Sequence, residues 1–170
     1  ECIIVDEEKY RNREDIEVVI IPEGVNVIGA DAFSCCENLL KVVLPDSLEI
    51  IEDRAFSNCR NLKEIVLPER LQEIGECAFD SCYSIENIVF PNKLKRIGEL
   101  AFCSCEKLKS VCFSHGLEEI GAGCFRDCDN LQSFSWPASV QKINNCMFIG
   151  CSSLRDLKIP EGVTSIDSSI

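Results

Sequence analysis

Apolar residues recur along this sequence with a fixed period of 23 residues. The period is clearest in three columns, of phenylalanine, cysteine and isoleucine: Phe33, Phe56, Phe79, Phe102, Phe125 and Phe148; Cys36, Cys59, Cys82, Cys105, Cys128 and Cys151; Ile28, Ile51, Ile74, Ile97, Ile120, Ile143 and Ile166. No insertion or deletion shifts these columns. A repeat of this length and regularity predicts a solenoid, in which each unit buries its apolar positions against its neighbours.

Each unit is expected to contain a short β-strand. In the segment 62–68, Ile65 and Leu67 alternate with outward-facing positions, which is the period of a strand with one buried face. Pro68 ends the strand, because proline has no N–H to donate to the ladder. A second short extended segment is expected to run through residues 71–74.

The opposite side of each unit is expected to be helical, because Ala78, Phe79 and Cys82 have helical spacing. Glycines that suit a turn with positive φ follow the isoleucine column at Gly29, Gly75, Gly98 and Gly121. The sequence therefore predicts an α/β solenoid with one short parallel β-strand per repeat on its concave face. Short helical or 3-10 turns would form the wider, convex face.

The register divides the chain into one array of repeats. We expect a degenerate first repeat at about 1–27, six regular repeats at about 28–165 and a truncated last repeat at 166–170. Because the chain ends inside a repeat, we expect it to be a fragment of a longer protein. About eight apolar positions per unit, worth roughly 2 kcal/mol each, cannot offset ordering costs of about 1–2 kcal/mol for each residue. A single unit therefore cannot fold alone.

The repeated motif Ile-Gly-x-x-Ala-Phe-x-x-Cys-x-x-Leu resembles the BspA-like (Treponema-type) class of leucine-rich repeats. The resemblance runs from about residue 5 to the end of the chain. It implies a right-handed leucine-rich-repeat superhelix. It also implies a cell-surface or secreted protein of bacterial or protozoan type that adheres to host proteins or to other cells. The family has no catalytic residues, so the resemblance implies none in this chain.

Charge narrows the range of partners. The chain carries 29 acidic and 17 basic residues, a formal net charge of −12. Such an acidic surface argues against nucleic acid, which needs clustered Lys and Arg. No apolar run reaches the roughly 18 residues of a membrane span, so no membrane insertion is expected. No signal peptide is visible in the sequence.

Thirteen cysteines invite a disulfide or metal interpretation. One cysteine per repeat in a strict column is typical of a packing position, so we expect the column to be buried and no disulfides to form. Of the scattered cysteines, Cys35, Cys103 and Cys112 are expected to face outward, and Cys2 lies near the chain end. A zinc site built from Cys124, Cys128, Cys146 and Cys151 would lack any C-x-x-C pair, so no metal is expected.

The sequence contains no G-x-S-x-G motif of hydrolases, no H-E-x-x-H motif of metalloproteases and no phosphate-binding loop. No catalytic residue and no cofactor are therefore predicted. The single histidine, His115, follows Ser114, which stands where the other repeats have proline. We interpret it as a solvated turn residue.

The strongest candidate site is an outward strand column that starts apolar and becomes polar. It reads Ile20, Val43, Val66, Val89, Cys112, Ser135 and Lys158, and its neighbour column includes Lys41, Glu64 and Asn87. An exposed apolar ridge favours a binding strip. The alternative is that β-branched residues simply favour strands.

The sequence predicts a non-catalytic, adhesin-like module that presents its sheet face to a protein partner, such as a host or cell-surface protein. Two alternatives stay open: a passive structural spacer, and an accessory domain of an enzyme outside this segment.

Overall fold

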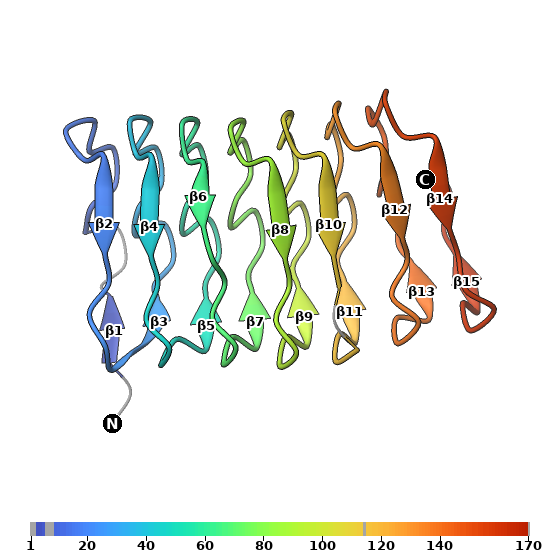
Figure 1. The fold of residues 1–170 in the computed structure, drawn as a ribbon, viewed down its shortest axis with the longest axis horizontal. Coiled ribbons are helices and arrows are strands. Elements are labelled where there is room, and N and C mark those ends of the chain that lie inside the picture. The colour runs from blue at the N-terminus through green and yellow to red at the C-terminus, as the bar shows by residue number, and fades with distance from the viewer. Residues whose placement is uncertain (1–2, 6–8, 114, 170) are drawn as a thin grey trace.

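In the computed structural model, which describes residues 3–5, 9–113 and 115–169, the chain winds into a parallel β-solenoid. Short strands form two rows along the solenoid axis (Figure 1). The first row contains β2 (Val18–Ile20), β4 (Lys41–Val43), β6 (Glu64–Ile65), β8 (Asn87–Val89), β10 (Ser110–Cys112), β12 (Ser133–Ser135) and β14 (Asp156–Lys158). The second contains β1 (Ile3–Val5), β3 (Val25–Ile28), β5 (Ile50–Ile51), β7 (Glu73–Ile74), β9 (Arg96–Ile97), β11 (Glu119–Ile120), β13 (Lys142–Ile143) and β15 (Ser165–Ile166).

Each coil thus has two strands, where the sequence predicted one. The second strand row forms where a second extended segment was expected, as β7 shows. Strands pair in parallel with the repeat register, so that Val42 lies opposite Val19 and Ile51 lies opposite Ile28. Equivalent residues of successive repeats therefore stack on one another, and each coil packs on the next in the same way.

The hydrogen-bonded ladders are not continuous from end to end. The first row consists of three sheets, β2-β4-β6, β8-β10 and β12-β14, and the second row of two, β1-β3-β5-β7-β9-β11 and β13-β15. Both rows are interrupted between the coil of β10 and β11 and the coil of β12 and β13. We call this place the coil junction.

The predicted helical or 3-10 turns are wrong, because the described residues contain no helix. Two residues per coil, one on each side of the phenylalanine, have left-handed φ, such as Cys77 at 53° and Ser81 at 58°. Two left-handed residues four positions apart interrupt any right-handed helix. The backbone instead donates to the next coil: the Phe79 N–H bonds the Ala101 carbonyl at 2.8 Å. The wider convex face was predicted from these helical turns, so the structure gives no basis for it.

The glycine prediction also needs correction. Among the described glycines only Gly24, Gly123 and Gly150 have positive φ, so Gly29, Gly75, Gly98 and Gly121 are not positive-φ turn residues. At Gly98 the reason for glycine is close approach of the preceding coil. A Cβ there would lie 2.5 Å from the carbonyl carbon of Gly75.

Stacked aromatic rings form the centre of the core. Ring centroids are 5.2 Å apart from Tyr10 to Phe33, 5.3 Å from Phe33 to Phe56 and from Phe56 to Phe79, 5.2 Å from Phe79 to Phe102 and 5.9 Å from Phe102 to Phe125. The stack then changes, because the Phe134 ring from β12 lies edge-on to both Phe125 and Phe148, at 5.2 and 4.8 Å. The parallel stack therefore ends at the coil junction.

The cysteine column is buried beside the ring stack, as predicted, for Cys36, Cys59, Cys82, Cys105 and Cys128, while Cys151 is half-buried. Each thiol donates to the carbonyl of the aromatic residue one coil back, as Cys82 Sγ does to Phe56 at 3.2 Å. Burial raises the pKa of the Cys82 thiol well above its usual range. These thiols therefore link neighbouring coils as neutral donors.

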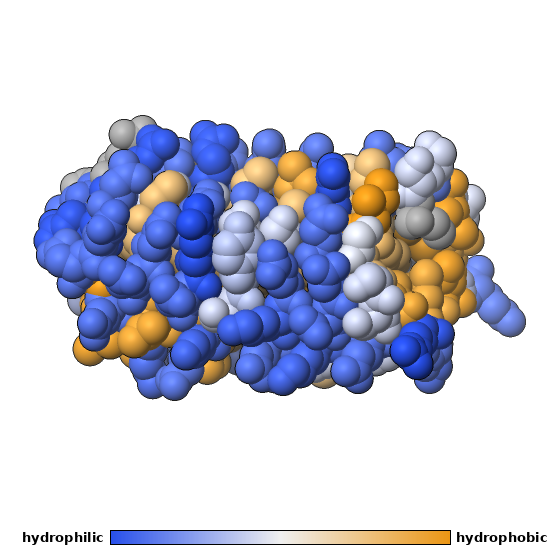
Figure 2. Space-filling model, turned by 90° about the horizontal axis from the view of Figure 1, so that it is seen from above, coloured by the Kyte–Doolittle hydropathy of each residue, from blue (hydrophilic) through white to orange (hydrophobic). Residues whose placement is uncertain are grey.

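Polar residues cover most of the face seen from above, whereas apolar residues gather toward the C-terminal end (Figure 2). The last coil contains β14 and β15, and its residues Leu154, Leu157 and Val163 are only partly buried. Their outer side has no further described coil against it.

Candidate binding surface

The outward column predicted as a binding strip lies on the surface of the first strand row. Ile20, Val43, Val66 and Val89 are 73, 41, 82 and 68% exposed, while the alternate positions Val42 and Ile88 are buried. The strand period of two thus separates a core face from an exposed apolar row. We call these four exposed residues the aliphatic strip. Their predicted outward placement is confirmed.

Beyond Val89 the same column becomes polar. Cys112, Ser135 and Lys158 are also exposed. Four successive coils therefore present an aliphatic side chain at this position, and the next coils do not. In this column, exposed aliphatic side chains are thus confined to the first four coils.

The neighbouring column starts with the exposed Val18 and is then polar and internally paired. Lys41 Nζ lies 2.6 Å from Glu64 Oε2, and this hydrogen bond, with the charge of Lys41, lowers the pKa of Glu64 below its usual value. Asn87 accepts a hydrogen bond from the Ser110 hydroxyl at 2.7 Å. On this side of the aliphatic strip, the ion pair leaves little uncompensated charge.

The other side of the strip is acidic, which the sequence reasoning missed. Glu23, Asp46 and Glu69 each follow a strip residue by three positions, in the turn after the strand, and all three are exposed. Within the described part of the chain, none of them forms an ion pair. Glu23 Oε1 accepts the Asp46 N–H at 3.2 Å. We call these three residues the acidic border. The sequence does carry a signal for the acidic border, because an acidic residue directly follows proline in three successive repeats.

A shallow hollow joins the strip to its acidic border. It measures about 180 Å³ and opens between β4 and the segment that continues β6. Val43, Val66, Asp46 and Glu64 contribute to its lining. Apolar and acidic side chains thus meet around one depression in the surface.

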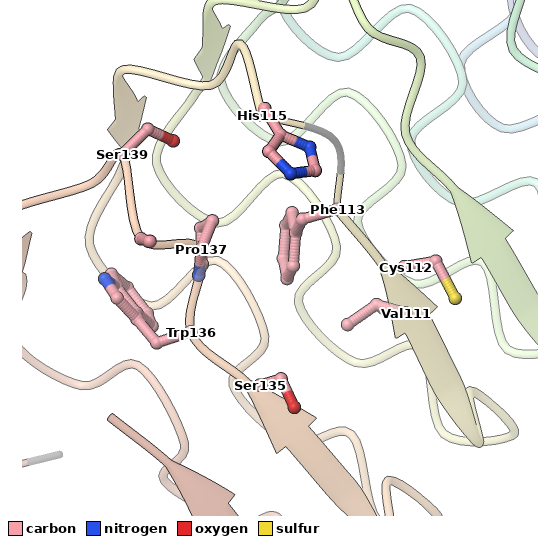
Figure 3. Close-up of a pocket in the computed structure, with 9 residues that line it drawn as sticks. Val111, Cys112, Phe113, His115, Ser135, Trp136, Pro137 and Ser139 are labelled. Carbon is pink, nitrogen blue, oxygen red and sulfur yellow. The ribbon is translucent and has the colours of Figure 1, made fainter. Parts of the chain in front are cut away.

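A larger cavity of about 430 Å³ opens at the coil junction (Figure 3). Phe113 and His115 line one side, and Trp136 and Pro137 line the other. Phe134 stands where the other repeats have valine, isoleucine or leucine. Trp136 stands where they have isoleucine, leucine or phenylalanine, and the ladders break beside these two larger side chains. His115 is exposed, as expected for a solvated turn residue, whereas Ser114 lies outside the described residues.

The scattered cysteines that the structure describes are not grouped as a metal site would require. Across the described residues, no group of three or more His, Cys, Asp or Glu side chains is placed to hold a metal ion. Cys124 and Cys128 are buried, and burial raises the pKa of both thiols, which disfavours the thiolate that zinc needs. Cys112 is exposed, as predicted, whereas Cys35 and Cys103 are half-buried. Cys2 lies outside the described residues.

A family model described as a BspA type leucine rich repeat region matches residues 3–95 and 72–170, with six copies. The chain belongs to the BspA-type leucine-rich repeat family. This membership confirms the resemblance drawn from the repeated motif. No helix in the described part of this family member is long and apolar enough to cross a membrane.

Two solved structures share the fold of this BspA-type chain. A leucine-rich repeat protein from Bacteroides ovatus is 30% identical, with a TM-score of 0.91, and the match covers 97% of this chain and 43% of that one. The Treponema pallidum leucine-rich repeat protein is 37% identical, with a TM-score of 0.86, and the match covers 89% of this chain and 73% of that one. No match is found among curated proteins. The chain therefore spans less than half of the Bacteroides protein.

Proposed function

We propose that this chain is a non-catalytic protein-binding module of a cell-surface or secreted protein, and that the aliphatic strip contacts the partner. The observation that carries the proposal is the exposure of one aliphatic side chain on each of four consecutive coils, which reaches 82% at Val66. Contiguous exposed apolar surface is uncommon unless something covers it. Placement outside the cell rests on the resemblance to the BspA-like family.

The competing explanation is that valine and isoleucine stand there only for strand propensity. Two features support binding over propensity. The aliphatic residues stop after Val89, although β10, β12 and β14 continue the same row. Moreover, the β6 strand ends at Ile65, one residue before Val66, so Val66 lies just outside the ladder that propensity would serve.

The test is selection of binding peptides from a displayed random library on the 170-residue protein, with counter-selection on the double variant Val66→Glu, Val89→Glu. Both side chains are exposed, so the variant should keep its melting temperature. We expect enriched peptides that bind the parent at least ten-fold more tightly than the variant. The matched control is Ser133→Glu, an exposed strand residue of the same row. Recovery only of peptides that bind both proteins equally would remove the strip as a binding site.

A passive spacer is the second candidate, because thiol and backbone hydrogen bonds link successive coils and would stiffen the molecule. Deletion of one whole 23-residue unit, residues 51–73, distinguishes the two. A spacer should keep its function in a shortened form, whereas a surface spread over several coils should lose affinity for the selected peptides.

A further inference from the structure

The aliphatic strip has a repeat distance that selects among the shapes a partner can take. Its four side chains occur once per coil, and the stacked rings inside the same coils are 5.2–5.3 Å apart. The spacing of hydrogen-bonded strands gives a similar value of about 4.8 Å. A partner that contacts all four side chains must therefore offer an apolar group about every 5 Å along the solenoid axis.

An α-helix meets this requirement, because its pitch is about 5.4 Å and residues three or four apart share one face. Over the three intervals of the strip, a helix drifts out of step by about 2 Å or less. An extended chain repeats a face only about every 6.7 Å, so it would be out of step by about 4–6 Å over the same distance.

The charge beside the strip adds a second condition. The acidic border places one exposed carboxylate per coil at Glu23, Asp46 and Glu69, on one side only. The other side carries the Lys41–Glu64 ion pair, which is already compensated. A complementary helix would therefore carry lysine or arginine along one edge of its apolar stripe, once per turn.

Resting on the proposed function, we infer that the partner segment is an amphipathic basic α-helix of about three turns that lies along the solenoid axis. Its apolar stripe packs on Ile20, Val43, Val66 and Val89, and its cationic edge faces the acidic border. The hollow between Val43 and Val66 receives an apolar side chain of the helix, with Asp46 at its rim.

Three 15-residue peptides test this inference. The first places leucine at every third or fourth position and lysine along one flank. The second has the same composition with leucine at alternate positions, and the third replaces each flanking lysine by glutamate. Binding to the 170-residue protein is measured by fluorescence anisotropy, and helix formation by circular dichroism.

We expect the first peptide to bind at least ten-fold more tightly than the other two, and to gain helicity when bound. Val66→Glu and the milder Val66→Ser should both weaken it, Val66→Glu by at least ten-fold, while Ser133→Glu should leave it unchanged. Asp46→Asn combined with Glu69→Gln should weaken binding several-fold and reduce its dependence on salt.

Two outcomes would overturn the inference and leave the binding strip in place. In one, the alternating peptide binds as tightly as the helical one. In the other, the glutamate peptide binds as tightly as the lysine one, and Val66→Glu abolishes both. Binding of the helical peptide that ignores both Val66 substitutions would instead count against the strip and the proposed function together.

Discussion

The aromatic column forms the centre of the core, where each ring packs between the rings of neighbouring coils. Phe33, Phe56, Phe79, Phe102 and Phe125 are at most 1% exposed and stack on one another. Their burial could be predicted from the sequence, because a large aromatic residue at the same position of six successive repeats favours packing between coils. The thiol hydrogen bonds beside them could not, because the sequence does not show which carbonyl a buried Cys82 would reach.

Phe79→Ala should lower the free energy of unfolding by about 3–5 kcal/mol, because the side chain is fully buried between two ring neighbours. The measurement is chemical denaturation followed by circular dichroism. Val66→Ala is the control and should change stability by less than about 0.5 kcal/mol, since Val66 is exposed. A loss below about 1 kcal/mol at Phe79 would be incompatible with its place in the stack.

The strands could be predicted and the turns opposite them could not. Alternation in 62–68 identifies the first strand of a coil directly. The helical prediction failed because the spacing of Ala78, Phe79 and Cys82 suits both a helix and two successive turns. The left-handed residues decide between these, but Arg54, Cys77 and Leu100 are not residue types that signal positive φ. The N–H groups of these three residues donate to carbonyls of the next coil, and these hydrogen bonds stabilise that conformation.

Gly98→Ala tests whether close approach, and not backbone conformation, explains the glycine column. The added Cβ would lie 2.5–2.7 Å from backbone atoms of Gly75 and Glu76, which cannot rotate away. We expect a loss of about 1–3 kcal/mol or more in the free energy of unfolding, measured by denaturant titration. Gly162→Ala is the matched control, because its nearest neighbour would be the Ala138 carbonyl oxygen at 3.6 Å. Equal effects at the two glycines would contradict the explanation by crowding.

At the scale of the whole molecule, the solenoid could be predicted from the period, but the coil junction could not. The sequence shows Phe134 and Trp136 as bulky departures from the repeat. It does not show that both strand rows break beside them, because larger residues can also be accommodated by shifts of neighbouring side chains. The acidic border, by contrast, could have been predicted, because Glu23, Asp46 and Glu69 each follow proline in three successive repeats and the register stacks them on neighbouring coils.

Hydrogen exchange should reveal the coil junction. The strands β12–β15 form only two-stranded sheets, whereas β5 and β7 lie inside a six-stranded one. We expect amides of β12–β15 to exchange at least ten-fold faster than those of β5 and β7, because local opening there breaks fewer ladder bonds. The measurement is deuterium uptake resolved by NMR. Uniform protection along both rows would show that the junction costs no stability.

The chain contains a single tryptophan, and the fold places it at the junction. The Trp136 indole is 4% exposed, and its N–H donates to the Val140 carbonyl at 2.8 Å. Its emission is therefore a built-in optical signal for this one place in the solenoid. The fluorescence emission maximum of Trp136 should shift to longer wavelength when water enters between these two coils, even while the ring stack farther along remains intact.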